Sequence, residues 1–257
     1  LEYPKINIIN LNTSSFSIET HFETFKHLIS QNQNGYYEYS FTLESGLTTP
    51  TLCVIEKQTH HHTTPLITKN DLVLVSGGAK GISALCAFEL ALKTGCALLL
   101  IGRSQQHEDK EVERNLKKFQ EAGLRVTYFA CDVRDTNALR FAIHAACENW
   151  NVSYISGFIH GAGLNRPKLI SQLNDDDITE QLSIKLDGFQ NILDLLQPEK
   201  LKLLISFSSI IARIGLRGEA HYAYSNEKLS ALCETFKHNN PHCLCRSIEW
   251  SVWSGAG

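Results

Sequence analysis

The sequence predicts an α/β fold built on a doubly wound parallel sheet, preceded by a small segment that contains strands. From residue 71 onward, short apolar runs alternate with longer segments whose apolar residues recur at helical spacing. Strands that alternate with helices of roughly 10 to 15 residues form βαβ units, whose parallel sheet is covered by helices on both faces. A glycine-rich turn directly after the first apolar run supports the same fold class.

The expected elements follow from this alternation. Strands are expected at residues 72–76, 97–102, 125–130, 155–160, 201–208 and 244–250. Helices are expected at residues 80–94, 109–121, 137–149, 178–196 and 222–238. The run at 72–76 contains only Leu, Val and Ser, which is typical of a strand buried on both faces. The segment 109–121 carries mixed charges at helical period, as a helix with one solvated face does.

Residues 1–70 differ in texture, being rich in Asn, Thr, Ser, His and aromatic residues. Residues 36–43 and 51–55 are expected as strands and residues 57–70 as a linker. His60, His61 and His62 lie in that linker, and three adjacent histidines cannot converge on one tetrahedral ion without further ligands. We interpret them as a solvated loop, and we expect two domains, at residues 1–70 and 71–257.

Composition limits the functional class. The 257 residues include 24 Lys and Arg against 27 Asp and Glu, for a formal charge of −3, and 43% are hydrophobic. These values are typical of a folded core and exclude a disordered, collagen-like or coiled-coil chain. A mild negative charge argues against nucleic acid as a partner, and the absence of a long apolar run argues against a membrane span. The chain contains no methionine, so we expect it to be a piece of a longer protein.

The eight cysteines give evidence about the redox state of the cellular compartment and little evidence for a metal or redox site. They lie mostly within apolar runs, and the only close pair is Cys243 and Cys245. A redox or metal pair there has no second pair to support it. We interpret the cysteines as free thiols in a reducing compartment, and the expected location is therefore cytoplasmic.

The turn after the first expected strand is the first candidate binding site. Glycines there allow a tight turn and a close backbone approach to a pyrophosphate, which the N–H groups and dipole of the following helix attract. A strand before the turn and a helix after it are the context that a Rossmann-like dinucleotide site requires. The cofactor loop comprises residues 76–83, and its candidate binding residues are Ser76, Gly77, Gly78, Lys80, Gly81 and Ile82.

Two further strand ends predict which nucleotide binds. The second strand ends in Gly102, Arg103 and Ser104, where an acidic residue would bind the ribose hydroxyls of NAD. Arginine and serine suit the 2′-phosphate of NADP instead. The third strand ends before Asp132 and Val133, where a carboxylate can accept a hydrogen bond from the adenine amino group. The expected cofactor is therefore NADPH.

Four residues form a candidate catalytic set. Ser209 ends the fifth strand at the carboxyl edge of the sheet, and Tyr222 lies 13 residues later at the start of a helix, with Asn226 one turn beyond it. Lys185 lies 37 residues before Tyr222, within another helix. This order and spacing resemble the short-chain dehydrogenase/reductase superfamily. They resemble in particular the ketoreductase domains of polyketide and polyunsaturated-fatty-acid synthases, which exchange the lysine and asparagine positions of most superfamily members.

The resemblance extends from Val73 to Gly255. It includes the cofactor loop, the block His160, Gly161, Ala162 and Gly163, the segments 206–209 and 218–223, and the segment 250–255. Residues 210–219 are similar to the iterative type I branch, including enediyne-type synthases. The resemblance implies that His160 orders the cofactor loop rather than acting as a base, and that residues 161–163 contact the cofactor. Ser83 stands where the family has its last loop glycine, and the markers of product configuration are missing at residues 164–167 and at Ile214.

A competing assignment of the tyrosine is possible, because Tyr224 and Lys228 form a Tyr-x-x-x-Lys pair. In that register Ile211 would replace the serine and Asp187 would replace the helix asparagine, so both partners would be missing. We therefore expect Tyr222 to be catalytic, Tyr224 to be a wall residue and Lys228 to face solvent.

The residue types define a mechanism. A ketone that accepts hydride develops alkoxide character, so its oxygen needs hydrogen-bond donors and a proton. Tyr222 would donate the proton, Ser209 would donate a second hydrogen bond, and Asn226 would help to hold a proton-relay water. Lys185 would bind the nicotinamide ribose and, together with the nicotinamide charge, lower the pKa of Tyr222.

The expected function is NADPH-dependent reduction of a β-ketoacyl thioester carried on an acyl carrier protein, within a synthase whose other domains are its partners. Residues 1–70 would then be a partial structural subdomain and residues 71–257 the catalytic ketoreductase subdomain. Two alternatives stay open. One is a stand-alone short-chain dehydrogenase for a small alcohol or ketone, and the other is a catalytically silent nucleotide-binding module within a synthase.

Overall fold

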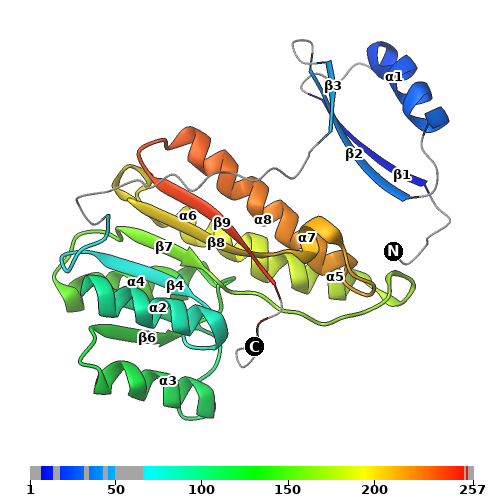
Figure 1. The fold of residues 1–257 in the computed structure, drawn as a ribbon. Helices are drawn as coiled ribbons and strands as arrows, with labels where there is room; N and C mark the ends of the chain where they lie inside the picture. Colours follow the sequence, from blue (N-terminus) through cyan, green and yellow to red (C-terminus); the bar gives the residue numbers. More distant parts are fainter. Residues whose placement is uncertain are drawn as a thin grey trace. The chain divides into compact units, whose positions relative to one another are not determined.

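The chain divides into two compact units, Leu1–His61 and His62–Gly257 (Figure 1). The computed structural model describes residues 7–13, 18–31, 35–42, 46–49, 66–251 and 253. The expected strand at 51–55, Cys53 and the histidines at 60–62 lie outside the described residues.

The first unit contains a small mixed sheet. β1 (Asn7–Thr13) pairs in parallel with β2 (Gly35–Thr42), and α1 (Ile18–Gln31) connects them. β3 (Gly46–Thr48) pairs antiparallel with β2. The strand expected at 36–43 is therefore present as β2, one residue earlier. α1, β1 and β3 were not expected from the sequence, because apolar and polar residues mix there without a clear period.

The second unit contains a six-stranded sheet in which every pair is parallel, and this confirms the predicted fold class. The strand order is β6-β5-β4-β7-β8-β9. The strands are β4 (Leu72–Ser76), β5 (Ala97–Gly102), β6 (Val126–Ala130), β7 (Gly157–His160), β8 (Leu203–Ser209) and β9 (Leu244–Trp250). The chain thus reverses direction across the sheet at β4, and ligands of open α/β sheets bind outside the carboxyl ends of the strands at such a point.

Helices cover both faces of this sheet. They are α2 (Gly81–Thr94), α3 (Lys110–Glu121), α4 (Thr136–Trp150), α5 (Asp175–Leu182), α6 (Gly188–Leu193), α7 (Ile211–Ile214) and α8 (Ala220–Asn239). Short 3₁₀ turns lie at η1 (Ile170–Gln172) and η3 (Pro198–Lys200). None of the helices that the structure describes is both long and apolar enough to cross a membrane.

Alternate residues of β4 enter two separate cores. Leu72 and Leu74 pack with residues of α4, α6 and α8, whereas Val73 and Val75 pack with residues of α2 and α3. This alternation buries both faces of a strand that contains no charged residue. The two cores hold the carboxyl edge of the sheet in place from both sides.

The long helix expected at 178–196 is interrupted in the structure. After α5 the chain passes through one turn of π-helix, η2 (Ser183–Asp187), before it continues as α6. Helical periodicity in the sequence does not distinguish a π-turn from an α-turn. Such turns are frequent at functional sites, and this one carries Lys185.

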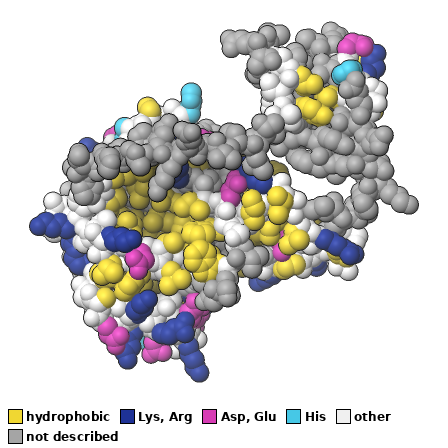
Figure 2. Space-filling model, in the orientation of Figure 1, with side chains coloured by type: hydrophobic (Ala, Val, Ile, Leu, Met, Phe, Trp, Pro, Cys, Tyr) yellow, Lys and Arg dark blue, Asp and Glu magenta, His cyan; other side chains and the backbone are white. Residues whose placement is uncertain are grey.

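The surface over α3 agrees with its charge pattern. In the space-filling view, Lys, Arg, Asp and Glu side chains are interspersed at the bottom of the second unit, where Figure 1 places α3 (Figure 2). The buried side of α3 carries Val112, Leu116 and Phe119. The helix is therefore amphipathic, as its sequence predicts.

Candidate active site

A cavity of about 710 Å³ lies at the carboxyl ends of the parallel strands. Its wall combines the cofactor loop with residues that follow β5, β7 and β8 and with residues of η2 and α8. A volume of this size is typical of small-molecule and cofactor sites. The predicted residues that line it are Gly77, Lys80, Gly81, Ile82, Arg103, Ser104, Val133, Gly161, Ala162, Gly163, Lys185, Ser209 and Tyr222.

The other predicted residues lie behind the wall or beside it. Ser76, Gly78, Asp132, His160 and Asn226 do not line the cavity. Asp132 forms an ion pair with Arg134 at 2.6 Å, and hydrogen bonding from Arg134 holds the pKa of this carboxyl below its usual range. In this structure the Asp132 carboxylate is thus bound to Arg134, two residues later in the chain.

Glycines bring two loops together at the base of the cavity. A Cβ atom at Gly77 would lie 2.9 Å from the carbonyl of Gly161, and Gly77 has φ +67°. A Cβ atom at Gly161 would lie 2.0 Å from the Ser83 Oγ. Only glycine allows this approach of the cofactor loop to the segment after β7. The resulting cradle of bare backbone next to the start of α2 fits a pyrophosphate.

Charged and polar side chains gather at the end of the cavity near α3. Lys80 Nζ lies 2.8 Å from Asp109 Oδ2, and the Ser104 hydroxyl donates to the same oxygen at 3.0 Å. The N–H of Gly81, the first residue of α2, donates to Glu111 Oε1 at 3.0 Å. Arg103 is exposed and forms no ion pair with any residue in the described part of the chain.

His160 is fully buried and connects two parts of the site. Its Nε2 lies 3.0 Å from the Lys185 carbonyl oxygen, and its Nδ1 lies 2.8 Å from the Ser76 Oγ. A carbonyl only accepts, so Nε2 carries the proton and Nδ1 accepts from the Ser76 hydroxyl. Burial, reinforced by the Lys185 charge, lowers the pKa of His160 to about 3. The imidazole is therefore neutral, and it does not reach the cavity.

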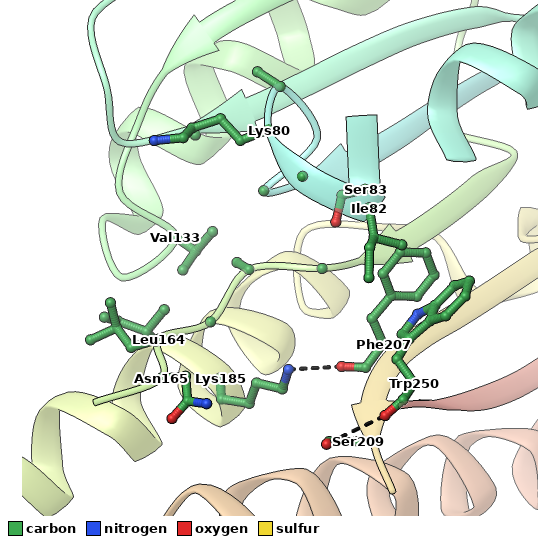
Figure 3. Close-up of a pocket in the computed structure, with 18 of the residues that line it drawn as sticks. Lys80, Ile82, Ser83, Val133, Leu164, Asn165, Lys185, Phe207, Ser209 and Trp250 are labelled. Atoms are coloured by element: carbon green, nitrogen blue, oxygen red, sulfur yellow. Dashed lines mark hydrogen bonds between the residues drawn. The ribbon is translucent and has the colours of Figure 1, made fainter. Parts of the chain in front are cut away.

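Lys185 crosses the cavity wall from η2 to β8 (Figure 3). Its ammonium donates to the carbonyl oxygen of Phe207 at 2.7 Å. Burial lowers the pKa of Lys185 to about 8, so the side chain still carries most of its positive charge at pH 7. A Cβ atom at Gly163 would lie 3.3 Å from its Nζ, so the glycine leaves room for the lysine.

Ser209 and Tyr222 meet at the other end of the cavity. The Ser209 hydroxyl lies 3.5 Å from the Trp250 carbonyl oxygen, an interaction drawn in Figure 3, and accepts from the N–H of Ile211 at 3.3 Å. Burial raises the pKa of Tyr222, and hydrogen bonding with the Ser209 and Asn226 side chains offsets this only in part. Desolvation is the largest effect on the phenol, and the Lys185 ammonium binds the Phe207 carbonyl oxygen. The lowering of this pKa by Lys185 together with the nicotinamide charge stays a prediction.

Asn226 supports Tyr222 from one turn along α8. Its Nδ2 donates to the Tyr222 carbonyl oxygen at 2.8 Å, and the residue is completely buried. The Asn226 Oδ1 is buried without a hydrogen-bond partner among the described residues. This free acceptor points to a donor, such as a water molecule, that completes its hydrogen bonding.

The alternative tyrosine lies elsewhere. Tyr224 is 58% exposed and does not line the cavity, so it is not the wall residue that we expected. Lys228 is exposed, as expected. On an α-helix, residues two apart point in different directions, and this geometry separates Tyr222 from Tyr224.

Several lining residues were not identified from the sequence. Glu111, Tyr128 and Asn165 lie on the cavity wall, and Trp250 and Trp253 lie near Ser209's end of it. The Tyr128 hydroxyl donates to the carbonyl of Ser104, which fixes the turn after β5. Glu111 lies in the first turn of α3, and Trp250 ends β9, so position in the fold is their signal in the sequence. Tyr128 lies in the middle of β6 and carries no such signal.

The comparisons with known proteins agree with this geometry. The KR domain family matches residues 72–255 of this chain. The chain is 29% identical over 191 residues to polyketide synthase PksN of Bacillus subtilis, covering 72% of this chain and 3% of that protein. It is 25% identical over 239 residues to a polyunsaturated fatty acid synthase of Thraustochytrium sp., covering 74% of this chain and 8% of that protein. The chain thus spans a small part of these relatives.

Solved structures share the fold. A ketoreductase domain from the bacillaene assembly line matches with a TM-score of 0.79 at 21% identity, over 98% of this chain and 59% of that chain. An alcohol dehydrogenase from the archaeon Thermococcus sibiricus, complexed with 5-hydroxy-NADP, matches with a TM-score of 0.62 at 22% identity, over 71% of this chain and 76% of that chain. The resemblance inferred from the motifs is confirmed: this chain belongs to the KR domain family.

Proposed function

We propose that this chain reduces a β-ketoacyl thioester carried on an acyl carrier protein, with NADPH as hydride donor, as one domain of a larger synthase. The observation that carries the proposal is the convergence of Lys185, Ser209 and Tyr222 on one cavity that also contains the glycine cradle. The relatives that the chain matches include a polyketide synthase and a polyunsaturated fatty acid synthase. Both names support an acyl thioester as substrate.

Three groups of residues would hold the cofactor. The cradle of Gly77 and Gly161 with the start of α2 suits the pyrophosphate, and Lys80, Arg103 and Ser104 suit a 2′-phosphate. Lys185 suits the nicotinamide ribose, because its ammonium lies on the cavity wall between η2 and β8. When bound, the nicotinamide cofactor supplies the hydride.

The chain's own side chains would manage the proton and the charge. Tyr222 donates its phenolic proton to the ketone oxygen, and the Ser209 hydroxyl donates a hydrogen bond to the same oxygen. The charge of Lys185 stabilises the phenolate that remains. Asn226 fixes Tyr222 through the main-chain carbonyl, and its free Oδ1 accepts from the water that returns the proton.

The seven cysteines that the structure describes are free thiols, and burial raises the pKa of each. Free thiols with raised pKa values suit a reducing compartment, and this supports a cytoplasmic location for the domain.

The test is NADPH absorbance with two substrates, a β-ketoacyl thioester and a simple bicyclic ketone such as a decalone. Oxidation of NADPH with the thioester supports the proposal, and oxidation only with small ketones supports a stand-alone dehydrogenase. No oxidation with either supports a silent module. Tyr222→Phe should lower turnover by at least about 100-fold while NADPH still binds.

The matched control is Tyr224→Phe, which removes the same hydroxyl from the neighbouring exposed tyrosine. It should leave turnover within about twofold of the unsubstituted chain. Turnover that survives Tyr222→Phe but fails with Tyr224→Phe would overturn the assignment.

A further inference from the structure

Two carboxylates at the start of α3 bind the groups that would hold the cofactor phosphates. These are Asp109 and Glu111, here called the acidic pair. Both lie beside the α2 end of the cavity, and Glu111 lines it. The inference rests on the proposed nucleotide cofactor and concerns what the acidic pair does to its binding.

Asp109 uses its two oxygens for different purposes. Its Oδ1 caps α3 by accepting from the N–H groups of Glu111 and Val112, at 3.0 and 3.2 Å. Its Oδ2 accepts from Lys80 at 2.8 Å and from the Ser104 hydroxyl at 3.0 Å. Two of the three groups suited to a 2′-phosphate are thus already bound to an anion of the protein.

Glu111 occupies the equivalent position for the pyrophosphate. Its Oε1 accepts from the N–H of Gly81, at the N-terminus of the 14-residue helix α2. The first N–H groups of a helix attract anions, and here a side chain supplies the anion. The Gly81 N–H would have to exchange this carboxylate for a phosphate oxygen.

Four charged side chains beside this end of the cavity, two of each sign, balance one another as a set. Lys80 and Arg103 are positive, and Asp109 and Glu111 are negative. A 2′-phosphate adds a charge of roughly −1.5 to −2. The attraction that Lys80 and Arg103 would exert on it is therefore largely cancelled, although the residue types after β5 favour NADP.

We propose that the acidic pair acts as an internal substitute for the cofactor phosphates, and that Asp109 determines specificity by reducing the preference for NADPH over NADH. Glu111 competes with the pyrophosphate, which both nucleotides share. Asp109 competes with the 2′-phosphate, which only NADPH has. The two carboxylates are therefore separable by their effect on the two nucleotides.

The experiment is calorimetric titration of NADP⁺ and NAD⁺ into the unsubstituted chain, Asp109→Asn and Glu111→Gln, so that no turnover is required. Asparagine keeps the helix cap, so α3 is retained. Removing one charge from a solvated anion site changes affinity by about tenfold. Asp109→Asn should lower the Kd of NADP⁺ by about tenfold and leave that of NAD⁺ within about twofold. Glu111→Gln should lower both by a similar factor.

The matched control is Asp135→Asn. Asp135 caps α4 as Asp109 caps α3, accepting from Asn137 and Ala138 at 3.0 Å, but unlike Asp109 it does not accept from Lys80 or Ser104. Its substitution should leave both Kd values unchanged.

Three outcomes contradict the inference. Weaker NADP⁺ binding by Asp109→Asn would mean that Asp109 orients Lys80 toward the phosphate instead of competing with it. Equal changes for both nucleotides in Asp109→Asn would remove its role in specificity. If the unsubstituted chain binds neither nucleotide, the proposed function fails together with the inference, whereas binding without the expected pattern refutes the inference alone.

Discussion

His160 donates a hydrogen bond from Nε2 to the carbonyl oxygen of Lys185, 3.0 Å away, and so connects the end of β7 to the π-turn that carries the lysine. The other ring nitrogen accepts from Ser76 at the end of β4. One buried imidazole thereby joins the cofactor loop to the candidate catalytic lysine. Because the ring does not line the cavity, this arrangement favours the prediction that His160 positions the loop and the lysine rather than transferring a proton.

Substitution of His160 should therefore destabilise the fold. His160→Ala leaves the Ser76 hydroxyl and the Lys185 carbonyl without a partner and opens a cavity beside Phe158 and Phe189. We expect the free energy of unfolding to fall by about 2 to 4 kcal/mol, measured by urea denaturation. The control His144→Ala, at an exposed histidine of α4, should change it by less than about 0.5 kcal/mol. Equal losses in both variants would contradict the positioning role.

The low pKa of His160 also predicts a dependence of stability on acid. Its pKa is about 3 in the fold and about 6.5 in an unfolded chain, so the unfolded state binds the extra proton between these values. Stability contributed by the neutral ring is present above pH 6.5 and is lost as the pH falls toward 3. The slope is at most about 1.4 kcal/mol per pH unit. The free energy of unfolding of His160→Gln, measured by urea denaturation, should lack this dependence on pH. If the variant and the unsubstituted chain lose stability in parallel as the pH falls, His160 is not the cause.

The lowered pKa of Lys185 predicts that the free energy of unfolding also depends on pH at the alkaline end of the range. Its pKa is about 8 in the fold and about 10.4 in an unfolded chain, so the unfolded state holds more protons between these values. The penalty for burying the charge is fully present below pH 8 and disappears as the pH rises to 10.4. Relative to Lys185→Met, the unsubstituted chain should gain about 1 kcal/mol per pH unit across this window. A constant difference between pH 8 and 10 would show that the ammonium is not desolvated.

The contact between Gly161 and Ser83 predicts that substitutions at these two residues have coupled effects on the free energy of unfolding. A methyl group at residue 161 would meet the Ser83 Oγ at 2.0 Å and its Cβ at 3.1 Å. Gly161→Ala alone should lower the free energy of unfolding by about 1 to 3 kcal/mol. Adding Ser83→Gly should recover much of this loss, measured as a coupling energy in a double-mutant cycle. Additive effects of the two substitutions would mean that the loops do not constrain each other.

Most strands of the second unit could be predicted from the sequence. β4, β5 and β9 have the expected bounds, because each is an apolar or alternating run that ends at a turn residue. The long helix was predicted without its π-turn, in which the carbonyl oxygen of Lys185 accepts a hydrogen bond from a histidine 25 residues earlier in the chain. No local periodicity contains that contact.

The candidate site likewise has residues that could be predicted from the sequence and contacts that could not. Ser209 and Tyr222 could be indicated by position, because the ends of parallel strands and the starts of the following helices meet at one edge of a sheet. Lys185 lies within a helix and was indicated by a spacing that resembles the ketoreductase domains. They did not indicate that Glu111 binds the N–H of Gly81, or that His160 and Asn226 lie behind the cavity wall. Those facts depend on which elements pack together and on how each side chain is oriented.

The sequence by itself therefore determined the fold class, the family and the residue types at the carboxyl edge of the sheet, because periodicity and strand-end motifs are local properties. Only the tertiary structure decided which polar groups face the cavity and which satisfy one another. The physical reason is that buried donors and acceptors must find partners, and the partners of Gly81, Ser76 and Lys185 come from distant parts of the chain.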